Sequence, residues 1–306
     1  MASFGFGDMI AKLKADPKVI VFTEGTDPRI LEAASRLLAG YFLKPILLGN
    51  PKEIEKAAED NGHNIRGAEM IDPENYDKMD EMVAEFCELR KKKGVTEEEA
   101  RKILSQSNYF GTMLVKMGVA DALLGGATYS TADTVRPAAT GDNEVMAMAD
   151  CAINIDPSED ELVEICGETV ECAKIFGVDP QVAFLSYSTL GSGKGEAVDK
   201  MRNAAKKAKA KYPEVPIDGE LQFDAAVAPR VARTKCQGSP VAGHANTFIF
   251  PDISAGNIGY KIAQRMGNFD AYGPILLGLN GSVNDLSRGC NALEVYSMAI
   301  ITAALA

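Results

Sequence analysis

Short apolar runs of strand length alternate along this chain with amphipathic stretches of helix length, and this alternation constrains the fold most. Lys18 to Glu24 is a β-branched run, and the helix-start signal Asp27-Pro28 separates it from the amphipathic stretch Arg29 to Gly40. Lys44 to Leu48 and the charged stretch Lys52 to Asn61 repeat the pattern. Repeated βα units predict an α/β protein with largely parallel sheets.

The pattern restarts near residue 150, which predicts a domain boundary there. From Ala152 the sequence indicates a strand, a proline turn and a long helix whose apolar residues recur at three and four positions. Val182 to Ser186 and Ala245 to Phe250 are further apolar runs of strand length. Because 306 residues suit one large or two ordinary domains, we expect two.

The composition excludes several classes of protein. A formal charge of −11 argues against a nucleic-acid or acidic-membrane binder, because such binding needs clustered Lys and Arg. No apolar run reaches the roughly 18 residues of a membrane span, and the first residues lack the apolar core of a signal peptide. The six cysteines show no CxxC spacing and only two histidines are present, which leaves little scope for a metal site. We expect a cytoplasmic protein with reduced thiols and no bound metal.

A glycine-rich loop, SYSTLGSGKG at residues 186–195, follows a predicted strand. Such loops can direct backbone N–H groups at an anion. The Walker pattern fails, because Ser188 stands at its first glycine and Gly195 follows Lys194. The loop is therefore either a generic anion-binding turn or a plain strand-to-helix connection. The residues of the loop that could bind such a ligand are Ser188, Thr189, Gly191 and Ser192.

Four arginines lie at the ends of predicted elements: Arg90, Arg136, Arg265 and Arg288. A guanidinium there can bind phosphate or carboxylate through two parallel hydrogen bonds. Each of them alone could be a surface ion pair. In an acidic protein, several cations beside polar loops predict a small polyanionic ligand.

The stretch from Ala271 to Cys290 combines a predicted strand, a polar loop and the approach to the last helix. The apolar run Ile275 to Leu279 predicts the strand, and an Asn-Gly pair breaks it. Ser287, Arg288 and Cys290 then place a hydroxyl, a guanidinium and a thiol within four positions. A strand, a polar loop and a helix in succession are how α/β proteins build sites.

The same stretch offers two carboxylates for proton transfer. Glu294 lies six residues after Arg288, about one turn inside the predicted helix, and Asp285 is the alternative. Asn284 or Asp285 could instead only cap the helix. Glu294 could equally be an ordinary carboxylate of the first helical turn.

Several segments resemble one enzyme family, the phosphate acetyltransferases. The similar segments are FLSYSTLGSGKG, DGELQFDAA, GHANTFIFPDISAGNIGYKIAQR, AYGPILLG and SVNDLSRGC. The resemblance covers nearly the whole chain, from TEGTDPR onward, and the last two segments are fairly specific to the family. It implies reversible transfer of an acetyl group between coenzyme A and inorganic phosphate, with no cofactor beyond coenzyme A as co-substrate.

The implied fold is two three-layer α/β domains like those of isocitrate and isopropylmalate dehydrogenases. Residues 1–148 and 277–306 would form the first domain and residues 149–276 the second, with a cleft between them. The resemblance also implies a homodimer.

The resemblance assigns roles to individual residues. Ser287 and Arg288 match the family's catalytic pair, and Arg265 in KIAQR matches a further functional arginine. Arg90 in ELRKKKG and Arg136 in TVRPA match arginines tied to coenzyme A binding. We expect the 188–192 loop and Cys290 to lie beside coenzyme A as well.

The chain departs from the family's pattern at two places. Glu294 stands where the family has its catalytic aspartate, so the carboxylate moves by one methylene. The segment between Arg136 and Met148 is shorter than in the family, which carries an extra strand there. Either the segment is truly deleted or the natural chain has further residues here; we favour the second, because loss of that strand would leave backbone groups of the sheet without partners.

The resemblance implies a direct mechanism, in which Glu294 deprotonates the coenzyme A thiol and the thiolate attacks acetyl phosphate. Arg288 and Ser287 would stabilise the reacting group. Three alternatives stay open: another acyl chain such as butyryl, an acyl-Cys290 intermediate, and a catalytically silent coenzyme A-binding regulatory protein. A metal-dependent decarboxylating dehydrogenase fits less well, because the chain lacks an acidic metal cluster and a nucleotide fingerprint.

Overall fold

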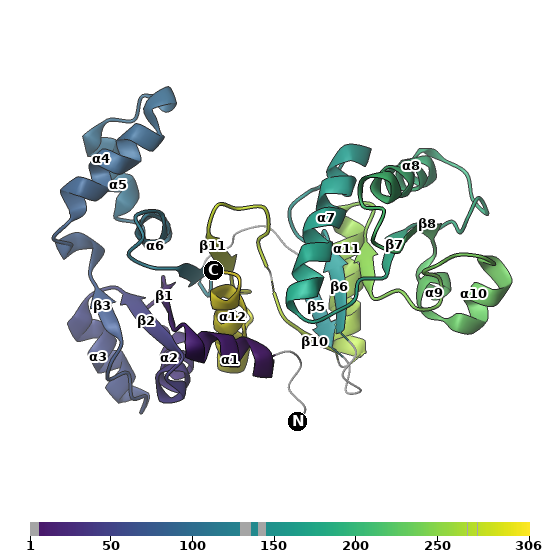
Figure 1. The fold of residues 1–306 in the computed structure, drawn as a ribbon. Helices are drawn as coiled ribbons and strands as arrows, with labels where there is room; N and C mark the ends of the chain where they lie inside the picture. The colour runs from purple at the N-terminus through teal and green to yellow at the C-terminus, as the bar shows by residue number, and fades with distance from the viewer. Residues whose placement is uncertain (1–5, 129–135, 140–144, 268, 274) are drawn as a thin grey trace. The chain divides into compact units, whose positions relative to one another are not determined.

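The chain folds into two compact units (Figure 1). The computed structural model describes residues 6–128, 136–139, 145–267, 269–273 and 275–306, with backbone only for 136–139. One unit, which we call the outer unit because its two segments lie before and after the other in the sequence, comprises Phe6–Thr131 and Leu279–Ala306. The other, the central unit, comprises Ala132–Gly278. The chain therefore leaves the outer unit once and returns to complete it.

The outer unit is built mainly from βα repeats. Its elements are α1 (Phe6–Ala15), β1 (Lys18–Phe22), α2 (Pro28–Gly40), β2 (Leu43–Leu48), α3 (Pro51–Asp60), β3 (Glu69–Ile71), the 3₁₀ helices η1 (Pro73–Asn75) and η2 (Lys91–Lys93), α4 (Met79–Leu89), α5 (Glu97–Leu104), α6 (Ser107–Lys116), β4 (Ala122–Gly125), β11 (Ser282–Asp285) and α12 (Ala292–Ala304).

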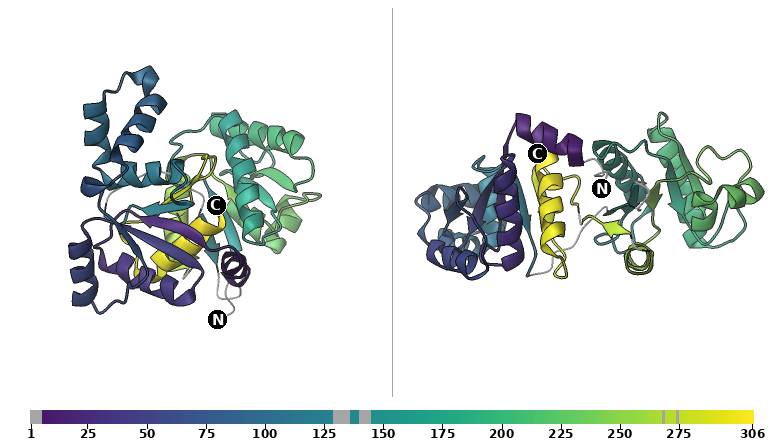
Figure 2. Two further views of the ribbon diagram at one scale, coloured as in Figure 1. Left: turned by 60° about the vertical axis from the view of Figure 1, so that its left-hand side comes forward. Right: turned by 90° about the horizontal axis from the view of Figure 1, so that it is seen from below.

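The outer sheet has the order β11-β4-β1-β2-β3, and all its strands run parallel. Ile20, Val21 and Phe22 of β1 are completely buried, as a strand covered on both faces requires. Val21 belongs to the core formed with α4, α5 and α6. On the other side of β1, α2 and α12 pack against each other and against the strands. Figure 2 shows α12, in yellow, among these N-terminal elements.

Local capping signals explain where α2 and α12 begin. Asp27 is the N-cap of α2 and accepts a hydrogen bond from the backbone N–H of Arg29, while Pro28 occupies the first helical position. Asn291 and Glu294 cap α12 reciprocally in a capping box. Asn284 and Asp285, which we considered as caps, lie in β11 instead.

The central unit contains a mixed sheet. Its elements are β5 (Arg136–Ala139), β6 (Val145–Ala149), α7 (Glu159–Ile175), β7 (Val182–Leu185), α8 (Glu196–Lys211), β8 (Ile217–Leu221), α9 (Phe223–Val227), α10 (Pro229–Lys235), β9 (Thr247–Ile249), α11 (Ile253–Met266) and β10 (Asp270–Ala271). The order is β10-β5-β6-β9-β7-β8; β6, β9, β7 and β8 run parallel, and the pairings of β5 with β10 and β6 are antiparallel.

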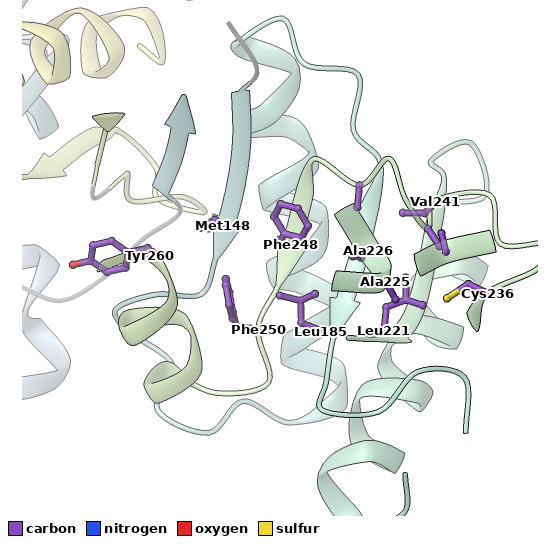
Figure 3. Packing of buried hydrophobic residues seen from close by; sticks show 14 of the residues in the cluster. Met148, Leu185, Leu221, Ala225, Ala226, Cys236, Val241, Phe248, Phe250 and Tyr260 are labelled. Carbon is purple, nitrogen blue, oxygen red and sulfur yellow. The ribbon is translucent and has the colours of Figure 1, made fainter. Parts of the chain in front are cut away.

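Helices cover both faces of the central sheet. Helices α7 and α8 pack on β6 to β9, and α8 lies against α7. A cluster of buried apolar side chains joins the strands to α9, α10 and α11 (Figure 3). Phe248 lies at its middle, with Leu185 from β7, Leu221 from β8, and Phe250 and Tyr260 toward α11. The predicted α/β class with largely parallel sheets is confirmed.

Three details of the sequence prediction are wrong. Ile275 to Leu279 is not a strand, since Gly278 has a φ of +71° and Leu279 is 54% exposed; the strand is β11. No strand lies between Ala152 and the start of α7; the strand of that region is β6, which ends at Ala149. The proposed boundary at 148/149 cuts β6, which pairs with β9 of the central unit.

No helix among the described residues is long and apolar enough to cross a membrane. All six cysteines are free thiols.

A buried carboxylate ties the loop after β7 to β8. Glu220 is 1% exposed, and its carboxylate accepts hydrogen bonds from the Ser188 hydroxyl (3.0 Å), the Gly191 N–H (2.7 Å) and two nitrogens of Arg202 (2.9 and 3.0 Å). Burial alone would raise the pKa of Glu220, but these donors outweigh it and lower the pKa. The anion that organises the loop is therefore a side chain of the protein.

We expect Glu220→Gln to lower the free energy of unfolding by about 2 kcal/mol at pH 7, because hydrogen bonds to a buried charged group are lost. Since the pKa of Glu220 is lowered in the folded protein, the ionised carboxylate contributes fully to the free energy of unfolding above pH ~4.3, and this contribution is lost as the pH falls below that value. Urea unfolding at several pH values measures the difference, with exposed Glu196→Gln as control. A deficit that stays constant into strong acid would contradict this role.

Candidate active site

The polar loops of the outer unit gather at one edge of its parallel sheet. The strands β1, β4 and β11 all end at this edge, because parallel strands share the direction of their carboxyl ends. From β1 the chain adds β2 and β3 on one side, whereas β4 and β11 lie on the other side. The edge beside β1 and β4 is thus a topological switch point, where open α/β sheets bind ligands.

The segment after β11 forms a tight exposed turn at this edge. The N–H of Leu286 donates to the carbonyl of Gly125 (2.6 Å), and the N–H of Cys290 donates to the carbonyl of Ser287 (2.8 Å). Ser287, Arg288 and Gly289 are exposed between the buried Leu286 and Cys290. Arg288 forms no ion pair with another described residue. A hydroxyl and a guanidinium are therefore presented side by side to solvent.

Arg29, near the start of α2, donates hydrogen bonds to the backbone of the Ser287–Arg288 turn. Its Nη1 donates to the carbonyls of Arg288 (3.0 Å) and Cys290 (3.1 Å) and contacts the Cys290 sulfur (3.6 Å). Its Nη2 donates to the carbonyl of Ala127 (2.9 Å). One side chain thus connects the segments that follow β1, β4 and β11.

Asp27 pairs with Arg29 and stabilises its charge. Asp27 Oδ1 accepts from Nε (3.0 Å) and Oδ2 from Nη2 (2.7 Å) of Arg29. Burial by itself would raise the pKa of Asp27, but the hydrogen bonds from Arg29 lower it. The hydrogen bond to Asp27 also raises the pKa of Arg29 above its ordinary value. Both groups are charged at neutral pH.

Glu24 anchors the loop after β4 in a similar way. Its Oε1 accepts from the N–H groups of Gly126 (3.0 Å) and Thr128 (3.3 Å). Gly126 has a φ of +90°, and a Cβ there would meet Asp285 Oδ1 at 1.7 Å, so only glycine lets β4 and β11 end this close together. Glu24, Asp27 and Arg29 were not among our predicted site residues, although the polar run TEGTDPR directly after a buried strand is the signal that could have found them.

Glu294 lies in the first turn of α12 and makes the capping contact with Asn291. Its Oε2 accepts from the backbone N–H of Asn291 (3.0 Å), and the Asn291 side chain accepts from the N–H of Glu294 (3.0 Å). These contacts occupy only one carboxylate oxygen. Glu294 also contributes a negative charge near Cys290. Glu294 can therefore cap α12 and lie beside the Ser287–Arg288 turn at the same time.

Cys290 is a buried, protonated thiol. Burial raises its pKa to about 11, and the nearby charge of Glu294 acts in the same direction, whereas Arg29 opposes them. Because the thiolate is the nucleophilic form of cysteine, Cys290 is a poor nucleophile at neutral pH.

The remaining predicted arginines lie elsewhere. Arg90 follows α4 as its C-cap and stacks over the Phe86 ring at 5.7 Å. Arg265 is exposed in the last turn of α11 in the central unit. The side chain of Arg136 lies outside the part of the chain whose side chains are described.

The predicted anion loop of the central unit is occupied by contacts within the protein. Ser188 and Thr189 are buried; Ser188 and Gly191 donate to Glu220, and the Thr189 hydroxyl accepts from the N–H of Gln222 (2.9 Å). The Ser192 hydroxyl accepts from the N–H of Thr189 (2.9 Å). The structure thus brings Ser287, Arg288, Cys290 and Glu294 together in the outer unit, and places Ser188, Thr189, Gly191, Ser192 and Arg265 in the central unit.

Among the described residues no group of His, Cys, Asp and Glu side chains is arranged to hold a metal ion.

Comparison with known proteins gives concordant matches over nearly the whole chain. The family model described as phosphate acetyl/butaryl transferase matches residues 6–141 and 138–303. A phosphate acetyltransferase of Bacillus subtilis (strain 168) is 49% identical over 320 aligned positions, which cover 98% of each protein. Since these positions outnumber the 306 residues of this chain, the alignment opens gaps in it.

Solved structures match in the same way. A phosphotransacetylase from Streptococcus pyogenes is similar with a TM-score of 0.92 and 46% identity, over 98% of this chain and 97% of that one. A putative 4-hydroxythreonine-4-phosphate dehydrogenase from Salmonella typhimurium, at 12% identity and a TM-score of 0.57, shares the fold alone, over 95% of this chain and 100% of that one. This likeness agrees with the dehydrogenase-like fold that we expected. The chain belongs to the phosphate acetyl/butaryl transferase family.

Proposed function

We propose that this protein catalyses the reversible transfer of an acetyl group between coenzyme A and inorganic phosphate. The observation that carries the proposal is the exposed Ser287–Arg288 turn at the switch point of the outer sheet, in a chain 49% identical to a phosphate acetyltransferase. Arg288 is exposed, and its guanidinium can bind an anionic substrate through two parallel hydrogen bonds.

The reaction proceeds in one step from a ternary complex. Glu294 takes the proton of the coenzyme A thiol, and the thiolate attacks the carbonyl carbon of acetyl phosphate. A carbon–sulfur bond forms, the bond from the carbonyl carbon to the bridging oxygen breaks, and phosphate leaves and receives the proton. Arg288 stabilises the developing negative charge and Ser287 donates a hydrogen bond to the reacting group.

The family resemblance assigns several residues to coenzyme A binding. Arg90 and Arg136 bind the phosphates of the nucleotide end, because a guanidinium matches phosphate geometry. Arg265 and the 188–192 loop are further residues that the resemblance ties to substrate binding. Cys290 lies beside the thiol end. The loop's hydrogen bonds to Glu220 indicate that it contributes mainly through its shape.

The family resemblance supports three further parts of the proposal. The protein acts as a homodimer, needs no metal, and works in the cytoplasm, where its six free thiols stay reduced. A longer acyl chain is the alternative within the family, and a silent coenzyme A-binding protein the alternative outside it. Exchange of labelled phosphate into acetyl phosphate excludes the silent protein, and rates with acetyl, propionyl and butyryl phosphate decide the acyl chain.

We expect Arg288→Ala to lower kcat by a factor of about 10² to 10³, since a donor to the developing charge is lost. Arg90→Ala should chiefly raise the KM for coenzyme A. Initial rates at varied coenzyme A and acetyl phosphate measure both, and Arg101→Ala, which removes an exposed ion pair with Asp80, serves as control. Equal losses of kcat in the two variants would contradict the division of roles.

Glu294→Gln separates the two roles of this carboxylate. Glutamine can keep the capping box, so stability should change by less than about 0.5 kcal/mol, while kcat falls about 10²- to 10⁴-fold because the base is lost. Asn291→Ala should do the reverse, costing about 1 kcal/mol while activity is largely kept. Thermal unfolding and initial rates test the pair. A fully active Glu294→Gln would exclude Glu294 as the base.

Cys290→Ala should keep measurable turnover, because burial raises the pKa of Cys290 to about 11 and leaves it a poor nucleophile at pH 7. The change should lie chiefly in the KM for coenzyme A. Alkylation of Cys290 at pH 8 should be about a hundredfold slower than that of a free thiol and speed up about tenfold per pH unit up to pH ~10. Mass spectrometry of iodoacetamide-treated protein measures this, with half-buried Cys87 as internal comparison. A trapped acetyl thioester on Cys290 would refute the direct route.

A further inference from the structure

The guanidinium of Arg29 has no hydrogen-bond donor left for a substrate. An arginine side chain carries five N–H donors in a planar fork. In this structure Nε donates to Asp27, Nη2 to Asp27 and the Ala127 carbonyl, and Nη1 to the Arg288 and Cys290 carbonyls. Five donors thus meet five oxygen acceptors, and Nη1 also contacts the Cys290 sulfur. Although it is a cation beside a predicted phosphate site, Arg29 is saturated by the protein itself.

The acceptors of Arg29 explain what it does. Two of them are backbone carbonyls of the turn that presents Ser287 and Arg288, and these lie 259 and 261 positions away in the sequence. Within that turn, only the Cys290-to-Ser287 hydrogen bond (2.8 Å) and a longer contact from the Gly289 N–H to the Ser287 hydroxyl (3.4 Å) hold the backbone. The Leu286–Gly125 hydrogen bond holds the start of the turn, and the Arg29 contacts hold the carbonyls of Arg288 and Cys290.

We propose that Arg29 is a positioning residue of the reaction, which acts by fixing the backbone at Arg288 and Cys290 and does not bind phosphate. This inference rests on the proposed function. It assigns Asp27 the part of holding the fork in plane, since the Asp27 carboxylate takes Nε and Nη2 together. A misplacement of reacting groups by about 1 Å can cost on the order of a hundredfold in rate, so the orientation of this turn matters to kcat.

The central test is Arg29→Lys. Lysine keeps the charge but offers three donors from one point, so it cannot reach the carbonyls of Ala127, Arg288 and Cys290 together. We expect kcat to fall about 10- to 100-fold, while the KM values for coenzyme A and acetyl phosphate change by less than about threefold. Arg36→Ala, on the exposed side of the same helix, is the control and should stay within about twofold of the unchanged protein.

A double variant distinguishes positioning from direct contact. If Arg29 acts through the turn, Arg29→Lys should have little further effect on kcat in an Arg288→Ala background, because the group that it positions is gone. The proposal is overturned if the fold losses of kcat in the two single variants multiply in full in the double variant, because Arg29 then works independently of Arg288. A rise in the KM for acetyl phosphate or phosphate as the main effect would overturn it as well.

Two controls keep the outcome unambiguous. Thermal unfolding of Arg29→Lys should remain within a few degrees of the unchanged protein. If the variant does not fold, Asp27→Asn is used, which keeps an oxygen to cap α2 but replaces the second oxygen that accepts from Arg29 with an N–H donor and removes the charge. The unchanged protein is assayed in parallel. Its inactivity would refute the proposed function, whereas an active protein with a fully active Arg29→Lys or Asp27→Asn would refute only the positioning role.

Discussion

The return of the chain to the open edge of the outer sheet is the constraint on which the rest of the site depends. The strand β11 pairs with β4 in parallel, and the register sets Asp285 opposite Gly125. This register places the next residues beside the segment after β4, where Leu286 donates to the Gly125 carbonyl. The approach is so close that a side chain at Gly126 would overlap Asp285. Backbone pairing therefore fixes where the Ser287–Arg288 turn begins, and the Arg29 contacts then act on its backbone.

Two hydrogen-bonded charges, the half-buried Arg29 and the buried Glu220, organise the loops of the two units by the same principle. In the outer unit a cation, Arg29, uses its donors on Asp27 and three carbonyls; in the central unit an anion, Glu220, takes Ser188, Gly191 and Arg202. A charge that is fully hydrogen-bonded in this way can hold a loop without the cost of an unpaired buried ion. It cannot serve a ligand at the same time. Arg29 and Glu220 are thus charges used within the protein to shape the loops. Arg288 differs from them, because it is exposed and has no ion-pair partner among the described residues.

This distinction marks how far the sequence could predict the site. Periodicity and capping signals gave the α/β class, and the resemblance directed attention to Ser287, Arg288 and Glu294. The run Ile275 to Leu279 misled, because apolar character alone does not distinguish a strand from an extended segment whose Gly278 adopts positive φ. Arg29 was missed, and the 188–192 loop was left open between an anion site and a plain connection, for the same reason: which donors are already used depends on partners up to 261 positions away.

Glu294 shows how one residue can satisfy a structural and a chemical demand together. A capping box needs a carboxylate or amide at the third helical position, and one oxygen is enough to accept from Asn291. An aspartate at this position has a shorter reach back to the N-cap, whereas glutamate spans it while its second oxygen is not engaged by the cap. The extra methylene is therefore not only a displacement of the base. It anchors the carboxylate to the backbone of Asn291, the residue after Cys290, so the turn and the proposed base are held in one hydrogen-bonded segment.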